Sequence, residues 1–125
     1  MFKLAAKAIE VAHKHKAEFG DIRIIEERRQ NISVKNGEIS GLTDQTTLGY
    51  GIRVLCGGAW GFASGSVMTG RAISDTTLKA IAIAKASRLL MAGRVRLAHE
   101  PAYTDFWQTP FLKDPFAVPV ETKLD

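Results

Sequence analysis

Residues Arg53–Gly65 read RVLCGGAWGFASG, and this stretch decides how the chain folds. Two adjacent glycines separate two runs in which large apolar residues alternate with small or polar ones, which is the pattern of two strands joined by a tight turn. A three-residue loop over residues 56–58 would place Val54 opposite Trp60, so that the large apolar side chains of both strands share one face. We therefore predict this loop rather than a loop of only the two glycines.

Glycine spacing in this region does not match a phosphate-binding loop. The residues Gly49-Tyr50-Gly51 begin a G-x-G pattern, but Val54 occupies the position of the third glycine. A second run, Gly65–Gly70, has the spacing of a P-loop, yet Arg71 and Ala72 stand where a lysine and a hydroxyl are needed. The sequence therefore argues against a nucleotide site.

Three glycines near the turn are expected to line the sheet face opposite the aliphatic residues: Gly49, Gly51 and Gly61. A strand pair without side chains on one face leaves its backbone open to a helix or to an extended ligand. Tyr50 and Arg53 are therefore candidate contacts for a bound peptide that adds as a strand. The alternative for both is structural, with Tyr50 in the core and Arg53 a solvated strand residue.

Patterns on either side of this stretch predict a helix and a second hairpin. Apolar residues at helical spacing predict an amphipathic helix over residues 2–19 that ends at Gly20. The dipeptide Asn36-Gly37 predicts a two-residue type I′ turn, which pairs Lys35 with Glu38.

Another helix is predicted over residues 74–92, with Ser74 or Asp75 as its N-cap and Gly93 as its stop. Its apolar stripe, expected to pack across the sheet, consists of Leu78, Ala82, Ala86 and Leu89. The predicted fold is α+β: an antiparallel sheet of about four strands in two hairpins, with both helices packed on one face.

The chain after residue 92 differs in composition. All four prolines and five aromatic residues lie in this part, and prolines oppose a regular helix or central strand. We predict an α+β domain over residues 1–92, followed by an extended strap over residues 93–125 that lies against a surface this chain does not supply. Residues 120–124 are expected to begin a further helix.

Composition narrows the class of protein. The formal net charge is +4 and the isoelectric point is about 9.4, but acidic residues are interleaved with the basic ones, which favours a mixed-charge surface over a nucleic-acid interface. The longest uncharged run, Val54–Gly70, is interrupted by glycines, so no membrane helix is predicted. The single cysteine, Cys56, cannot form an internal disulfide, which favours the cytoplasm, and a structural role for it is favoured over a nucleophilic one.

No catalytic residue and no metal ligand is predicted in this chain. His13 and His15 are two residues apart, so on a helix they point about 200° apart and cannot share a metal. The pair His99-Glu100 begins like a zinc-hydrolase motif, but Pro101 follows at once and no second histidine stands at helical spacing.

Four stretches taken together resemble the N-terminal domain of the TldD/PmbA family, often labelled modulators of DNA gyrase. They are DIRIIEERRQNISVKNGEISG (21–41), LGYGIRVLCGGAWGFAS (48–64), IAIAKAS (81–87) and TPFLKDPFAV (109–118). The resemblance covers nearly the whole chain. The segments GFAS (61–64) and DPF (114–116) favour the TldD branch over its PmbA (TldE) partner.

The resemblance implies a zinc metalloprotease that degrades short or unfolded peptides and pairs with a TldE/PmbA-like partner or with itself. In such proteins a His-Glu-x-x-x-His helix later in the chain holds the zinc, and none of its residues maps onto this sequence. The chain is therefore expected to be a fragment or truncated product, to bind no cofactor and to be inactive alone. Its expected partners are the missing C-terminal domain, the TldE/PmbA-like protein and an unfolded peptide. The alternative is a freestanding regulatory module that binds nucleic acid or DNA gyrase.

Overall fold

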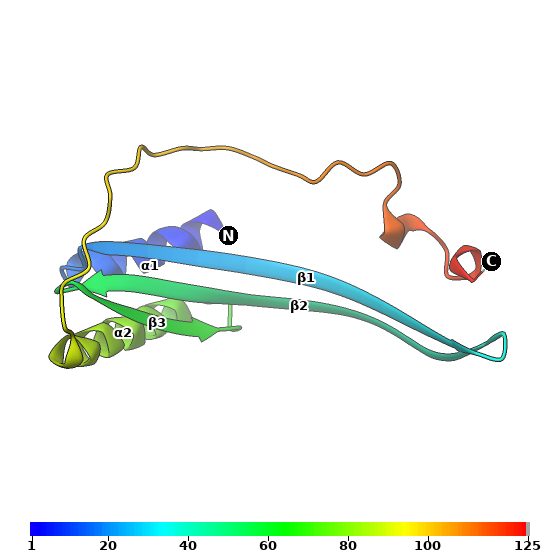
Figure 1. Cartoon of the computed structure of the whole chain (residues 1–125), viewed down its shortest axis with the longest axis horizontal. Helices are drawn as coiled ribbons and strands as arrows, with labels where there is room; N and C mark the ends of the chain where they lie inside the picture. Colours follow the sequence, from blue (N-terminus) through cyan, green and yellow to red (C-terminus); the bar gives the residue numbers. More distant parts are fainter. Residues whose placement is uncertain (125) are drawn as a thin grey trace. The chain divides into compact units, whose positions relative to one another are not determined.

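The computed structural model describes residues 1–124 and has an α+β fold (Figure 1). Its main elements are α1 (Phe2–Lys14), β1 (Phe19–Lys35), β2 (Glu38–Cys56), β3 (Ala59–Gly65) and α2 (Gly70–Ser87). Short 3-10 turns follow at Arg88–Leu90, Pro115–Ala117 and Glu121–Lys123. The sheet has three strands in the order β1-β2-β3, rather than about four, because the 19-residue β2 belongs to both hairpins.

The chain forms two compact units. Unit 1 contains residues Met1–Arg29 and Gln45–Leu97, and unit 2 contains Gln30–Asp44 and the chain from Ala98 onward. Unit 1 contains both helices, β3, the part of β1 up to Arg29 and the part of β2 from Gln45. The residues that line the cavities described for this fold all belong to unit 1.

The hairpin between β1 and β2 follows the prediction. The strands end at Lys35 and resume at Glu38, and the two residues between them, Asn36 and Gly37, have φ of 54° and 81°. These left-handed values define the type I′ turn that Asn-Gly favours. Local turn chemistry is sufficient to determine this hairpin.

The predicted three-residue loop between β2 and β3 is wrong. Val54 pairs with Gly61 and Cys56 with Ala59, so only Gly57 and Gly58 form the turn, with φ of 63° and 81°. Because the register differs by one residue from the prediction, the aromatic side chains of β3 lie on the face opposite the aliphatic residues of β2.

Close packing against α2 explains this register. A Cβ atom placed on Gly61 would lie 2.0 Å from the carbonyl oxygen of Ala80, so only glycine fits where the helix crosses the strand. Ala59 and Ala63, on either side of Gly61, are also buried on this face. Gly61 therefore faces the helix, and the prediction that it lies on the opposite face with Gly49 and Gly51 is wrong.

Both helices pack on one face of the sheet, as predicted. Residues of α1, α2 and β2 form a single buried cluster, and its members include Ala8, Ala12, Ile52, Val54, Ile73, Ala80 and Ala84. The predicted stripe of α2 is wrong, because Leu78 is 41% exposed and Leu89 is 85% exposed. The helix instead buries Ile73, Thr77, Ala80, Ile81 and Ala84, and its small residues Ala80 and Ala84 lie where it crosses Gly61.

Helix boundaries also differ from the prediction. The first helix ends at Lys14 because Lys16 adopts a left-handed φ of 59°, and Gly20 belongs to β1. The second begins four residues earlier than expected, because the hydroxyl of Thr69 accepts a hydrogen bond from the amide of Ala72 at 3.2 Å. It ends at Ser87, before the 3-10 turn.

Unit 2 has little regular structure outside its strand residues. Asp114 accepts a hydrogen bond from the amide of Phe116 at 2.9 Å and begins the turn at Pro115–Ala117. The expected further helix is a single 3-10 turn, from which Lys123 donates to the side chain of Gln30. That residues 93–125 lie as a strap against a surface outside this chain stays a prediction.

Candidate functional site

The sheet face of unit 1 that points away from α1 and α2 is called the open face. It carries alternate residues of each strand: Asp21, Arg23, Ile25, Glu27 and Arg29 of β1; Gln45, Thr47, Gly49, Gly51, Arg53 and Leu55 of β2; Trp60, Phe62 and Ser64 of β3. Ile25 is 64% exposed and Phe62 is 58% exposed. This face thus presents apolar side chains to solvent, beside backbone that lacks side chains at two glycines.

Three adjoining cavities run along the open face and are called together the strand groove. The largest, of about 410 Å³, is lined by Asp21, Arg23, Ile25, Tyr50, Gly51, Arg53, Phe62 and Ser64. The second, of about 280 Å³, shares Ile25 and Gly51 with the first and continues over Gly49 and Thr47. The third, of about 150 Å³, shares Glu27 and Thr47 with the second.

Arg53 is held in place at the wider end of the strand groove. Its guanidinium forms an ion pair with Asp21, with Nε 3.1 Å from Oδ2. The same group lies over the ring of Trp60, with Cζ 4.7 Å from the ring centroid. Trp60 in turn meets Phe19 edge to face, with ring centroids 5.9 Å apart. These contacts fix the guanidinium of Arg53, whose side chain as a whole is 42% exposed beside the cavity.

Tyr50 and Arg53 both border the 410 Å³ cavity of the strand groove, but their side chains lie on opposite faces of the sheet. The hydroxyl of Tyr50 lies 3.1 Å from Oγ1 of Thr76 on α2, and Tyr50 is only 4% exposed. Its hydroxyl would lie 2.7 Å from a Cβ placed on Gly65, so a glycine is required there. The structure thus brings Arg53, but not the hydroxyl of Tyr50, into the groove. Peptide binding by these two residues stays a prediction.

Sequence reasoning missed three residues that shape the groove: Arg23, Ile25 and Phe62. The sequence pattern pointed to two of them, because Arg23 and Ile25 alternate with Ile22 and Ile24, which pack against the core from the other face. The position of Phe62 required the correct β2–β3 register.

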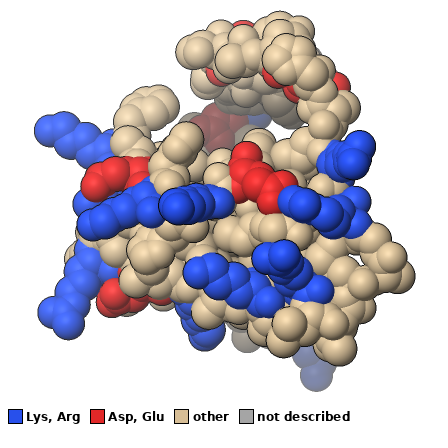
Figure 2. Space-filling model, turned by 90° about the vertical axis from the view of Figure 1, so that its left-hand side faces the viewer, with Lys and Arg blue, Asp and Glu red and all other residues tan. Residues whose placement is uncertain are grey.

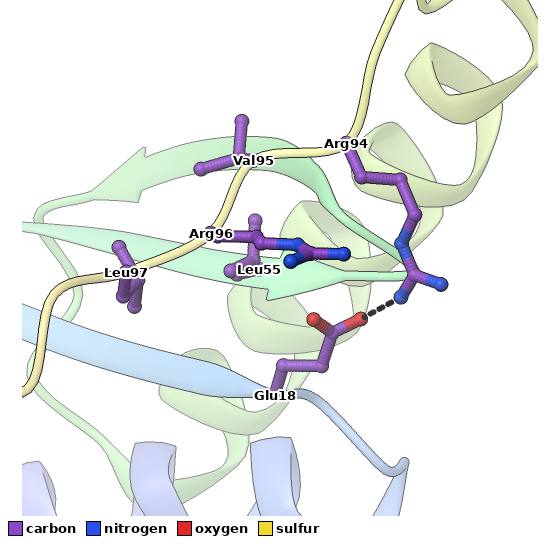
Figure 3. A pocket seen from close by; sticks show the side chains of 6 residues that line it. All are labelled: Glu18, Leu55, Arg94, Val95, Arg96 and Leu97. Atoms are coloured by element: carbon purple, nitrogen blue, oxygen red, sulfur yellow. Dashed lines mark hydrogen bonds and ion pairs between the residues drawn. The ribbon is translucent and has the colours of Figure 1, made fainter.

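A further cavity, of about 470 Å³, lies where the chain after α2 crosses the end of β2 (Figure 3). In it, Oε1 of Glu18 accepts hydrogen bonds from the amide of Gly58 at 3.0 Å and from Nη2 of Arg94 at 3.3 Å. The amide of Val95 donates to the carbonyl of Gly58 at 2.9 Å. These bonds use the carboxylate of Glu18 to hold together the start of β1, the Gly57-Gly58 turn and the chain after α2. We therefore assign this cavity a structural role.

Basic side chains gather at the end of unit 1 that carries the Gly57-Gly58 turn (Figure 2). The side chains of Arg88 and Arg94 lie against this turn, since Cβ atoms placed on Gly57 and Gly58 would each come within 2.8 Å of one of them. Glu18 is the acidic partner of Arg94, at 3.3 Å. This end of unit 1 is therefore basic, and of its two arginines Arg94 is neutralised by Glu18.

Cys56 is buried at the end of β2. Burial raises the pKa of its thiol, which the nearby charge of Lys85 partly opposes and that of Glu18 reinforces. A raised pKa leaves less thiolate, so this environment suits a structural cysteine better than a nucleophile.

The described residues do not provide a metal centre or a membrane span. Within residues 1–124, no three side chains of His, Cys, Asp or Glu converge closely enough to hold a metal ion. Neither α1 nor α2 combines the length and hydropathy that a membrane-spanning helix requires.

Solved structures with a similar fold include the following two. A protein from Thermotoga maritima labelled "modulator of a DNA gyrase" matches with a TM-score of 0.68 and 17% identity, over 98% of this chain and 26% of that one. TldE from Thermococcus kodakarensis matches with a TM-score of 0.62 and 17% identity, over 89% of this chain and 23% of that one. This chain thus spans about a quarter of each relative, and at this identity the likeness concerns the fold alone. No curated protein is significantly similar in sequence.

A family model described as PmbA/TldA metallopeptidase domain 1 matches residues 20–84. The matched range begins at the second residue of β1 and ends in α2, so it contains nearly all of the sheet and most of α2. It covers 65 residues (84 − 20 + 1), just over half of the 125 in the chain. The chain belongs to the PmbA/TldA metallopeptidase domain 1 family.

Proposed function

We propose that this chain is the non-catalytic N-terminal domain of a TldD-like zinc metallopeptidase, in which it guides short or unfolded peptides toward the active site and takes part in assembly. The family match over residues 20–84 carries this proposal. The strand groove supports the part concerning peptides, because Gly49 and Gly51 lower the floor for an extended chain lying across the sheet face. The peptide would not add to β2 as a further strand, since β2 already pairs with β1 and β3. Arg53 is the fixed polar contact of this groove, and Tyr50 contributes to its border.

Zinc belongs to the remainder of the proposed enzyme. The described residues do not fit a zinc site, because no three ligand side chains converge among them, and we assign no reaction step to this domain. In this proposal residues 1–92 form the domain, and residues 93–125 form a strap that leads to the catalytic part. The enzyme would be cytoplasmic, and its assembly partner would be a TldE/PmbA-like protein or a second copy.

The coding sequence beyond Asp125 tests the family role directly. We expect it to continue for several hundred residues and to include a His-Glu-x-x-x-His helix. An immediate stop codon would contradict the proposal. The purified chain, supplied with zinc and a fluorogenic unfolded peptide, should release no product, and chelator-sensitive hydrolysis would contradict a non-catalytic role.

A second candidate is a freestanding regulatory module that binds nucleic acid or DNA gyrase. The basic end around the Gly57-Gly58 turn favours an anionic partner (Figure 2). Binding to duplex DNA that weakens steeply between low and physiological salt, and that is lost in Arg88→Glu, would support it. Lys79→Glu is the matched control, because Lys79 is exposed on α2 and changes the net charge equally.

A further inference from the structure

The strand groove is floored by β2, which lacks side chains on this face only at Gly49 and Gly51. A Cβ atom placed on Gly49 would meet only the carbonyl oxygen of Gly65, at 3.5 Å, so the space above Gly49 is open. The ring of Phe62 lies over Gly51, where a Cβ would come within 2.8 Å of it, and forms one apolar wall. Ile25 of β1 lines the same cavities and stands more than half exposed.

The groove is long enough for an extended peptide. Its cavities share residues from one to the next and follow β2 from Arg53 to Gln45. Eight strand steps of about 3.3 Å give roughly 26 Å. This is the length of about eight residues of an extended peptide.

One positive charge in the groove lacks a counterion. Asp21 pairs with Arg53, and Glu27 pairs with Arg29 at 2.8 Å, so four of the charged groups neutralise one another. Among residues 1–124 no acidic side chain pairs with Arg23, which is exposed between these two pairs. A ligand of complementary charge therefore places a carboxylate beside Arg23.

We infer that the strand groove binds an extended peptide in which an apolar side chain and an acidic side chain are separated by one residue. Arg23 and Ile25 are two positions apart on the same strand face, about 6.6 Å along the strand. An extended peptide repeats its own side chains with the same spacing, so one residue contacts Ile25 and Phe62 while the next on that side reaches Arg23. This inference rests on the proposed peptide-guiding function and adds to it a class of substrate.

The test uses the whole chain labelled with ¹⁵N and a capped nonapeptide, STETLTETS, followed by amide chemical shifts. Its leucine has a glutamate two residues away on both sides, so either peptide direction satisfies the spacing, and capping removes the terminal carboxylate. We expect shifts centred on residues 23–25, 49–51 and 62 at peptide concentrations up to about 1 mM. The lysine version, STKTLTKTS, and the misplaced version, STTELETTS, should bind at least about tenfold more weakly.

Three variants locate the contacts. Arg23→Glu should reverse the preference toward the lysine peptide. Gly49→Val should abolish binding by filling the floor, and it is expected to fold because its Cβ makes only an ordinary contact. Lys79→Glu, on the helical side, should bind as the unchanged protein does. Absence of shifts with every peptide, shifts outside the groove, or an unchanged preference in Arg23→Glu would overturn the inference. A coding sequence that continues into a metallopeptidase would still support the family role in that case.

Discussion

The two faces of the sheet in unit 1 use side-chain size in opposite ways. On the helix-covered face, glycine and alanine of β3 allow α2 to approach to backbone contact, and the aliphatic residues of β2 fill the remaining space. On the open face, the large residues Trp60 and Phe62 stand partly in solvent, and Trp60 is held by its contacts with the ring of Phe19 and the guanidinium of Arg53. The helices therefore bury small residues on one face while two aromatic side chains stay partly exposed on the other, and Leu55 of the open face is buried only where the chain after α2 crosses it.

The largest effect is expected from enlarging the covered face at its tightest point. Gly61→Val should lower the free energy of unfolding by more than about 4 kcal/mol, because its Cβ would overlap the backbone of α2 at Ala80. Urea unfolding followed by circular dichroism measures this. Gly93→Val is the control, since nothing lies within 4 Å of a Cβ there. A loss below about 1 kcal/mol for Gly61→Val would contradict the close packing.

A matched pair of isoleucines compares the faces directly. Ile52 is 1% exposed on the covered face, and Ile25 is 64% exposed on the open face. Ile52→Ala should cost roughly 2 to 4 kcal/mol, because it leaves a cavity in the core. Ile25→Ala should cost less than about 1 kcal/mol. Equal losses in urea unfolding would mean that the open face is as well packed as the covered one.

Cys56 reports on the covered face through its reactivity. Because burial restricts access and raises the pKa of the thiol, alkylation by iodoacetamide at pH 8 should be at least about 100-fold slower in the folded chain than in urea. A folded pKa above the unfolded one also means that the stability from this thiol is present below the unfolded pKa and declines as the pH rises through the folded pKa. Cys56→Ala should remove that decline, and comparable alkylation rates in both states would contradict the burial.

The smallest effect is expected from the ion pair on the open face. Asp21→Asn and Arg53→Met should show a coupling energy of about 0.5 to 1 kcal/mol in a double-mutant cycle, because both groups are partly exposed. Added salt should reduce it. Arg53→Met should also change the fluorescence of Trp60, measured with Trp107→Phe as background so that one indole remains. A coupling above about 2 kcal/mol would mean that the pair is shielded from water.

Sequence patterns predicted the local features of this fold better than the tertiary ones. The Asn36-Gly37 turn was predicted because its two residues alone prefer the required φ values. The Gly57-Gly58 turn was predicted with the wrong loop length, because the register there depends on how closely α2 crosses Gly61. The predicted stripe of α2 failed for the same reason, since α2 crosses Gly61 with Ala80 and Ala84 and leaves Leu78 exposed.

The candidate site was predictable only in part. Arg53 was identified from its place beside glycines on a strand, and it does line the groove. The contributions of Arg23 and Phe62 depend on which strands are neighbours and in which register, and a single sequence does not state this.

The carboxylate of Glu18 has a consequence for folding kinetics. Glu18 directly precedes β1 and bonds to the amide of Gly58 and to the side chain of Arg94, across sequence separations of 40 and 76 residues. Contacts that close such long loops form late, whereas the β2–β3 hairpin closes a short one. Glu18→Gln is therefore expected to speed unfolding while leaving the folding rate nearly unchanged. Glu18 would then determine the lifetime of the folded state rather than the rate at which that state forms.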